Sequence, residues 1–220
     1  MMERIPEPEL MDGAEQAAAY AGADFEEPNS HFVRLFAEHV GAPSGPVLDI
    51  GCGPGDIVLR LARQYPGIHV HGLDGADAML AFAREAVAAE PELEPRVAFV
   101  LGTVPGAVLP ADGYAAVTSN SLLHHLHDPM GLWQMIRAVA QPGATVLVMD
   151  LFRPTDRAAA ARIVDTYGAG EPEVLRTDFF NSLLAAFTPD EVRDQLRRAG
   201  LTGLAVETVS DRHLLVHGRV

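Results

Sequence analysis

Residues 47–56 have the sequence VLDIGCGPGD, and this short stretch decides the fold class. Its first four residues are apolar apart from Asp49 and are typical of a buried strand. Glycines at positions 51, 53 and 55 permit a tight turn in which a ligand can approach the backbone without meeting a Cβ atom. A helix is expected to begin at Asp56, where free N–H groups favour a carboxylate or another anion. The stretch therefore predicts the first strand–turn–helix unit of a ligand-binding α/β sheet.

The chain continues this alternation of strand and helix on the carboxyl side of the turn. The pattern predicts strands at residues 46–50, 68–73, 96–101, 114–118 and 144–150, and helices at 56–65, 77–90 and 128–140. Asp128 is the expected N-cap of the helix at 128–140. Short apolar strands separated by helices predict a doubly wound parallel sheet with right-handed crossovers. A capping box at Thr188 begins another helix, and residues 204–220 form an antiparallel pair of strands, which makes a seven-stranded, mostly parallel sheet.

Two helical additions are expected around this sheet within a single domain covering residues 1–220. Residues 1–42 form an N-terminal helical cap, with a loose start at 1–13 and helices at 14–21 and 31–40, the second capped by Asn29 or Ser30. Residues 153–187 form a helical lid insertion beside the carboxyl ends of the strands, where ligands bind in such sheets. Its substrate-binding candidates are Tyr167, Arg176 and Phe179. The alternative is a helical pair that covers the sheet edge or makes a homodimer.

Composition excludes several classes of protein. Sixteen basic residues, all of them Arg, stand against thirty acidic residues and give a net charge of −14, which argues against nucleic acid or an anionic membrane as a partner. The single cysteine, Cys52, excludes an internal disulfide and a multi-cysteine zinc site. No apolar run approaches the ~20 residues that span a bilayer, so a cytoplasmic protein is expected.

A carboxylate at the end of the second strand limits the choice of ligand. Asp74 lies where it can accept both hydroxyls of a ribose, as in dinucleotide-binding folds. The nicotinamide-dinucleotide fingerprint Gly-x-Gly-x-x-Gly, however, requires a glycine at position 56, which is Asp56 here. Placing Asp49 and Asp56 close to a pyrophosphate would cost Coulomb energy on the order of a kcal/mol or more, even when the charges are partly screened. The same carboxylates suit a cationic ligand.

The segment from about Val47 to Asp150 resembles the class I S-adenosylmethionine (SAM)-dependent methyltransferases that act on small molecules. The resemblance implies the Rossmann-like methyltransferase fold, SAM as cofactor and a small-molecule methyl acceptor. It also implies that the first-strand acid and glycine turn hold the methionyl part of SAM and that the second-strand acid holds its ribose. The positions it assigns to cofactor binding are Asp49, Gly51, Gly53, Gly55, Asp74, Gly75, Met79, Thr103, Val104 and Asn120. Relatives often carry Gly-Asp-Ala where this chain has Gly102-Thr103-Val104, so the contact with adenine is expected to differ.

The candidate catalytic residues are His124, His125 and Tyr20. The two histidines follow the fourth strand, whose carboxyl end faces the SAM pocket in this fold, and His124 is expected to lie nearest the methyl group. A packing role for these histidines remains an alternative, as does a purely packed Tyr20. No metal site is expected, because the spacing of His124, His125 and His127 does not suit one helix face and no Cys or Glu partner is expected nearby.

The predicted activity is methyl transfer from SAM to a small molecule, without nucleic acid or membrane as partner. Two alternatives remain at this point: a SAM-binding regulatory or scaffolding protein without transferase activity, and an NAD-dependent oxidoreductase.

Overall fold

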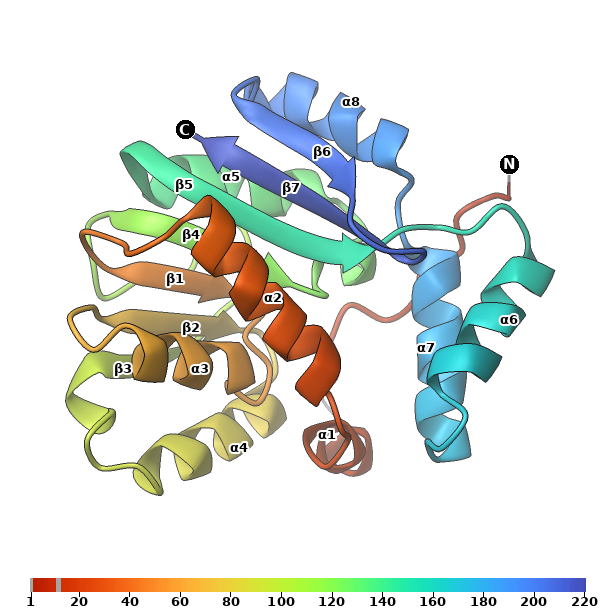
Figure 1. Ribbon diagram of the computed structural model, residues 1–220, viewed down its shortest axis with the longest axis horizontal. Helices are drawn as coiled ribbons and strands as arrows, with labels where there is room; N and C mark the ends of the chain where they lie inside the picture. The colour runs from red at the N-terminus through yellow and green to blue at the C-terminus, as the bar shows by residue number, and fades with distance from the viewer. Residues whose placement is uncertain (1, 11–12) are drawn as a thin grey trace.

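The computed structural model describes residues 2–10 and 13–220, and residues 1, 11 and 12 of the expected N-terminal cap lie outside the described residues. Seven strands form one sheet in the order β3-β2-β1-β4-β5-β7-β6, shown in Figure 1. The strands are β1 (Val47–Ile50), β2 (Val70–Asp74), β3 (Val97–Leu101), β4 (Tyr114–Asn120), β5 (Ala140–Leu151), β6 (Leu204–Thr208) and β7 (His213–Arg219). The first five are parallel, and β7 is antiparallel to both β5 and β6. The predicted seven-stranded, mostly parallel sheet is confirmed.

Helices cover both faces of the sheet. They are α1 (Ala14–Ala21), α2 (Glu26–His39), α3 (Asp56–Gln64), α4 (Asp77–Ala88), α5 (Met130–Val139), α6 (Arg157–Tyr167), α7 (Glu173–Ala185) and α8 (Pro189–Ala199), with 3-10 turns η1 (Glu94–Arg96) and η2 (Leu123–His125). Apolar side chains of α2, α3 and α4 pack on one face of β1 and β2, and those of α5 and α8 pack on the other. Figure 1 shows α2 and α3 in front of the sheet and α5 behind it. Among the described residues, no helix has both the length and the apolarity needed to cross a membrane.

The helix α2 begins earlier than the sequence predicts. It starts at Glu26 rather than His31, and neither Asn29 nor Ser30 is its N-cap. The N-cap position is Phe25, which has no side-chain cap, and the Asp24 carboxylate just before it accepts the Glu26 N–H at 2.9 Å. Pro28 falls in the first turn, where the missing N–H costs no helical hydrogen bond.

Two other boundaries differ for local reasons. Asp128 is not the N-cap of α5; that position is Pro129, although Asp128 Oδ1 accepts the Met130 N–H at 3.0 Å. The strand β5 begins at Ala140 instead of 144, because Ala140 pairs with Tyr114 and an irregularity after Tyr114 restores the register at Thr145. The predicted capping box of α8 and its stop at Gly200, which has a left-handed conformation, are confirmed.

The sheet order reverses at β1, and this reversal positions the site. The neighbours β2 and β4 lie on opposite sides of β1, so the turns that follow β1 and β4 diverge toward opposite faces of the sheet. Parallel α/β sheets bind ligands in the crevice that such a divergence opens. Helices α6 and α7 lie beyond the carboxyl ends of the strands, at the right of Figure 1.

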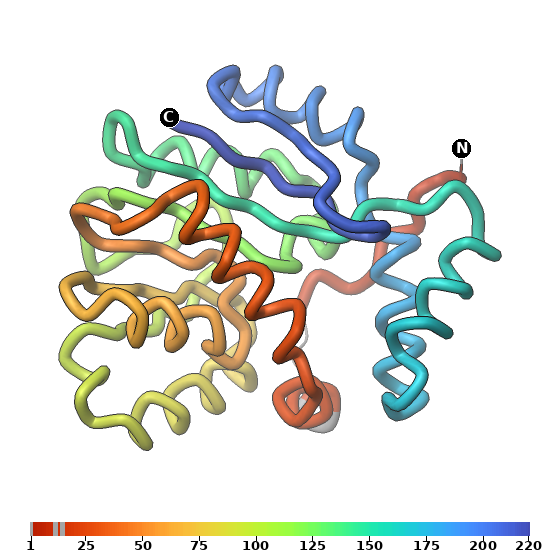
Figure 2. Tube along the Cα trace, in the orientation of Figure 1, coloured from red at the N-terminus to blue at the C-terminus, as the bar shows by residue number. Residues whose placement is uncertain are grey.

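The N-terminal segment is held in place, and the expectation that residues 1–13 are loose is wrong for residues 2–10. The Ile5 N–H donates to the Leu184 carbonyl of α7 at 3.0 Å. The Arg4 guanidinium donates to the carbonyls of His124 and Leu126 at 2.8 and 2.9 Å. Figure 2 shows this segment running between the sheet and α7. Arg4 also donates to the Ala185 carbonyl at the end of α7, so one arginine joins the segment to both η2 and α7.

Candidate active site

A cavity of about 880 Å³ opens at the carboxyl ends of β1, β2 and β4. The glycine turn after β1 forms its floor, and α2 and the segment before it form one wall. Two backbone bonds fix the turn to β2, because the N–H groups of Gly51 and Cys52 both donate to the Leu73 carbonyl, at 2.7 and 3.0 Å. The backbone at Gly51 has φ +74°, and a Cβ added there would lie 2.8 Å from the Leu122 side chain. Only glycine fits at that position.

The Asp74 side chain shapes the same turn. Its Oδ2 accepts the Gly53 N–H at 2.8 Å and its Oδ1 accepts the Ala76 N–H at 2.8 Å. One carboxylate thus connects the glycine turn after β1 with the start of α4 after β2. Asp74 lies in the cavity wall, which is where the sequence places its ribose contact.

Asp49 is the buried acid of the cavity. It is 1% exposed, and the Thr118 hydroxyl donates to its Oδ1 at 2.9 Å. Burial raises the pKa of Asp49 to about 7, although the Thr118 hydrogen bond acts in the opposite direction. A carboxyl group with this pKa gains charge readily when a cationic ligand arrives.

Most of the expected cofactor-binding residues lie in the wall of this cavity. The wall includes Asp49, Gly51, Gly53, Asp74, Gly75, Met79, Thr103, Val104 and Asn120. Gly55 is not among the lining residues. It is the left-handed N-cap of α3, and a Cβ there would lie 2.9 Å from the Phe99 ring. Its requirement for glycine therefore comes from packing.

A second cavity of about 1160 Å³ adjoins the first. Tyr20, Phe25, Asn29, Asn120, Ser121 and His125 are among the residues that line both. The second cavity extends to α6 and α7, and all three expected substrate-binding residues, Tyr167, Arg176 and Phe179, line it. The Gln16 amide of α1 donates to Asp178 of α7 at 3.0 Å, which joins the two helical additions at the rim.

The polar side chains of α6 and α7 already have partners in the protein. The Tyr167 hydroxyl donates to Asp211 at 2.8 Å, and the Arg212 guanidinium stacks 3.3 Å from the centre of the Tyr167 ring. Arg176 donates to the Gly168 carbonyl at 2.7 Å and forms an ion pair with Asp165 at 2.8 Å. Arg176 therefore holds the end of α6 against α7.

Tyr20 lies where the two cavities meet. Its ring packs against Phe25, with ring centres 4.6 Å apart. Burial, reinforced by the Asp74 charge, raises the pKa of Tyr20 to about 12. The phenol therefore keeps its proton near neutral pH, which makes it a hydrogen-bond donor rather than a base.

The two histidines of η2 occupy different positions. His125 lines both cavities, whereas His124 lines only the second. The expectation that His124 lies nearest the methyl group stays a prediction; of the two histidines, only His125 lines the first cavity. His124 is instead 3% exposed, and its Nδ1 lies 2.5 Å from Oδ1 of Asp150. Burial acts to lower the pKa of His124, but the Asp150 and Glu7 carboxylates outweigh burial and raise it.

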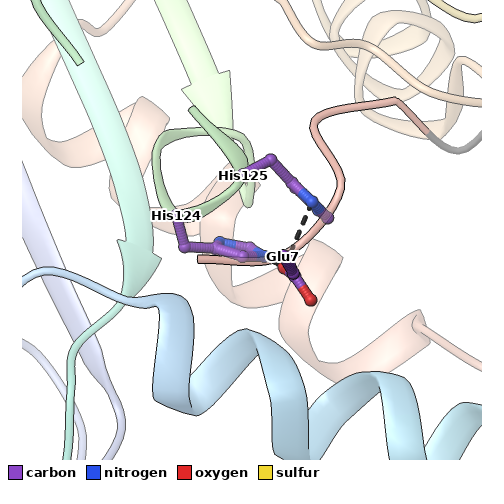
Figure 3. Close-up of side chains that lie close together, drawn as sticks. All are labelled: Glu7, His124 and His125. Atoms are coloured by element: carbon purple, nitrogen blue, oxygen red, sulfur yellow. Dashed lines mark ion pairs between the residues drawn. The ribbon is translucent and has the colours of Figure 1, made fainter. Parts of the chain in front are cut away.

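Sequence reasoning missed Glu7, whose carboxylate lies beside both rings (Figure 3). Its Oε1 is 3.2 Å from Nδ1 of His125 and 3.6 Å from Nε2 of His124. More than a hundred residues separate Glu7 from the histidines, so no spacing rule could find it. The expectation of no metal site assumed that no Glu was near these histidines, and the fold contradicts this premise.

Comparison with known proteins agrees with this geometry. The model of the family described as "Methyltransferase domain" matches residues 47–143, which run from the start of β1 to the first residues of β5. An uncharacterized methyltransferase of Mycobacterium tuberculosis is 27% identical over 87% of this chain and 92% of its own length. Residues 47–143 therefore carry a methyltransferase domain.

Two further proteins are similar to this chain, one in sequence and one in structure. A trans-aconitate 2-methyltransferase of Rhizobium meliloti is 30% identical over 60% of this chain and 48% of its own length. A SAM-dependent methyltransferase from Aquifex aeolicus has a crystal structure that superposes with a TM-score of 0.70 at 17% identity, covering 94% of this chain and 98% of that one. The fold is thus shared over nearly the whole methyltransferase, and sequence identity is low.

Proposed function

We propose that this methyltransferase binds SAM in the first cavity and methylates a small molecule that binds in the second. The observation that carries the proposal is the wall common to both cavities, which includes Tyr20, Asn120 and His125. A methyl group at that wall can pass from one cavity to the other without crossing solvent. Direct attack on the methyl carbon needs this kind of alignment, and positioning supplies most of the catalysis because the sulfonium is an activated leaving group.

The charge of the first cavity supports the assignment of SAM to it. Its described lining residues include eight acids and two arginines: Glu9, Asp24, Glu26, Asp49, Asp56, Asp74, Glu90, Asp128, Arg60 and Arg63. SAM carries a cationic sulfonium and an ammonium group, so these carboxylates attract it, whereas they repel the pyrophosphate of NAD. In the proposed pose the SAM ammonium faces Asp49 and the ribose hydroxyls face Asp74.

The second cavity favours a neutral or cationic acceptor with an apolar portion. Its described lining residues include six acids and two arginines: Glu7, Asp24, Glu27, Glu171, Asp178, Asp211, Arg176 and Arg212. Both arginines have carboxylate partners in the protein, Asp165 for Arg176 and Asp211 for Arg212. Apolar contact is available from Phe25, Met149, Leu175 and Phe179. A polycarboxylate such as the acceptor named for the Rhizobium relative is therefore disfavoured here.

The candidate catalytic residues take separate roles in this proposal. His125 contacts the acceptor, because its ring meets both cavities. His124 positions His125, since the two rings stack with centres 4.2 Å apart and Asp150 holds the ring of His124. Tyr20 donates a hydrogen bond to SAM or to the acceptor.

The test is a binding and turnover experiment. Calorimetry is expected to show SAM and S-adenosylhomocysteine binding at one site per chain and no binding of NAD. A library of neutral, cationic and polycarboxylate acceptors is then incubated with methyl-labelled SAM. Transfer to a neutral or cationic compound supports the proposal, and transfer confined to polycarboxylates refutes the assignment of the second cavity. Binding of NAD in preference to SAM refutes the assignment of the first.

A further inference from the structure

Three atoms that can act as metal ligands converge in the wall of the second cavity. They belong to Glu7 on the N-terminal segment and to His124 and His125 on η2, and they lie within 4.8 Å of one another. Figure 3 shows both rings directed toward the Glu7 carboxylate. We define these three residues as the Glu7 cluster.

The contact with Asp150 fixes which ring nitrogen of His124 faces into the Glu7 cluster. A carboxylate only accepts, so Nδ1 of His124, 2.5 Å from Asp150, carries the proton of that imidazole. When this ring is neutral, its Nε2 presents a lone pair toward Glu7. The Nδ1 of His125 is fully buried and has no hydrogen-bond partner among the described residues. Three possible ligand atoms thus converge, and a cation bound among them offsets the charge of the Glu7 carboxylate and gives the buried Nδ1 of His125 a partner.

The two distances from Glu7 match those between ligand atoms of a metal site. A tetrahedral Zn²⁺ ion with ligands at 2.0–2.2 Å places those ligands roughly 3.3–3.5 Å apart. The Glu7 Oε1 atom is 3.2 Å from Nδ1 of His125 and 3.6 Å from Nε2 of His124. Two imidazole nitrogens and one carboxylate oxygen are also the ligand set of catalytic zinc and of non-haem Fe(II) sites, both of which keep positions open for substrate.

The surroundings hold these ligands in orientation, as expected around a bound metal. Asp150 fixes the tautomer and the ring of His124, and it also accepts the Leu123 N–H at 2.6 Å. The Ser182 hydroxyl donates to Oε1 of Glu7 at 3.0 Å. Carboxylate support behind a histidine ligand and hydrogen bonding to a carboxylate ligand are the usual outer-shell contacts of metal sites. Arg4 fixes the segment that carries Glu7 by donating to the His124 carbonyl at 2.8 Å.

We propose that Glu7, His124 and His125 bind one divalent first-row transition metal ion, whose open positions face the acceptor cavity and take an oxygen or nitrogen atom of the acceptor. The role toward the acceptor rests on the proposed function, whereas the binding of the metal does not. The ion neutralises the three converging acceptor atoms and fixes the acceptor at the wall common to both cavities.

Metal binding is tested on the untagged full chain after treatment with a chelator. Co²⁺ is titrated while its visible absorption is recorded, and Zn²⁺ is then added as a competitor. The expected result is one Co²⁺ per chain with a tetrahedral or five-coordinate spectrum, displaced by one Zn²⁺. Glu7→Gln and His125→Asn each remove a ligand but leave the His124–Asp150 pair intact, and each is expected to weaken Co²⁺ binding at least about 100-fold.

The matched control is His31→Asn, which removes a histidine of the same cavity outside the Glu7 cluster and is expected to leave Co²⁺ binding unchanged. Circular dichroism confirms that each variant folds. If the wild-type chain binds Co²⁺ no more tightly than Glu7→Gln and His125→Asn, the inference is refuted and the cluster holds a proton instead. SAM binding is measured on the same samples. If the chain binds SAM but does not bind Co²⁺, the metal site alone is overturned. If it binds Co²⁺ but does not bind SAM, the proposed function alone is overturned.

Discussion

Nδ1 of His124 lies 2.5 Å from Oδ1 of Asp150, and neither residue is more than 3% exposed. This contact joins the turn after β4 to the end of β5, two strands that are neighbours in the sheet. It makes His124 part of the structure that holds the site, and it leaves His125 as the histidine that reaches the cofactor cavity.

His124→Ala is expected to destabilise the protein by about 3–5 kcal/mol, because it leaves the buried Asp150 carboxylate without its partner. Urea unfolding followed by circular dichroism measures the change. His127→Ala is the control, since the His127 side chain on the same loop is 57% exposed, and little effect is expected there. Equal unfolding midpoints for wild type and His124→Ala would show that the pair does not stabilise the fold.

SAM affinity is expected to rise as pH increases through about 7. Burial raises the pKa of Asp49 to about 7, so its carboxyl group is protonated in the free protein below that pH. The SAM ammonium favours the ionised form, so binding at pH 6 releases a proton, which calorimetry in buffers of different ionisation enthalpy detects. Asp49→Asn is expected to abolish the release. The free protein follows the same linkage: because the folded pKa lies above the ordinary value of 3.8, the free energy of unfolding falls as pH rises between the two values. Proton release that persists in Asp49→Asn would assign it to another group.

Asp74→Ala is expected to weaken SAM binding by about 1.5–3 kcal/mol, the range for hydrogen bonds to a charged group. The loss includes the proposed ribose contact and the order that Asp74 gives to the glycine turn through Gly53. Calorimetric titration with SAM gives the value. Asp112→Ala removes an exposed acid away from both cavities and serves as the control for the change in net charge. Similar losses of SAM affinity in both variants would show that the loss arises from the change in net charge rather than from the contacts of Asp74.

Residues 153–187 are expected to control access of the acceptor. Arg176→Ala and Phe179→Ala should raise the acceptor KM and leave SAM affinity unchanged, because both residues line only the second cavity. Arg162→Ala, an exposed position of α6 outside that cavity, is the control. Hydrogen exchange in this segment should be fast with SAM alone and slower with acceptor. Unchanged KM values in both cavity variants would assign α6 and α7 to covering the sheet.

The sequence predicted the sheet well because its signals are local. The glycine turn at 47–56 and the apolar strands each depend on residues that are neighbours in the chain, and the structure has seven strands as expected. The predicted start of α2 was wrong by five residues, because the helix begins after Phe25 without a side-chain cap, and Asp24 accepts its first N–H. The Asn29 side chain instead donates to Asp56 of α3 at 2.6 Å, a contact between helices that no local pattern reveals.

The proposed acceptor side of the site was less predictable, because its residues come together through contacts between distant parts of the chain. The position of Glu7 depends on Arg4, which reaches the carbonyl of His124, 120 residues away. A segment with two prolines and several acids has the composition of a loose start, and only tertiary contacts show that it is ordered. The three substrate-binding candidates Tyr167, Arg176 and Phe179 line the second cavity as placed, whereas their roles toward an acceptor stay predictions.

The N-terminal segment also bears on how acceptor preference diverges among relatives. Residues 47–143 supply the glycine turn and most of the first cavity, whereas much of the wall of the second, the proposed acceptor cavity, comes from residues 7–31 and 166–182, outside that range. Substitutions in residues 166–182, which line the second cavity and not the first, can change the shape and charge of the proposed acceptor cavity while the first cavity stays intact. Two chains with closely matching residues 47–143 can therefore methylate chemically unrelated compounds, and their shared ancestry predicts a shared donor rather than a shared product.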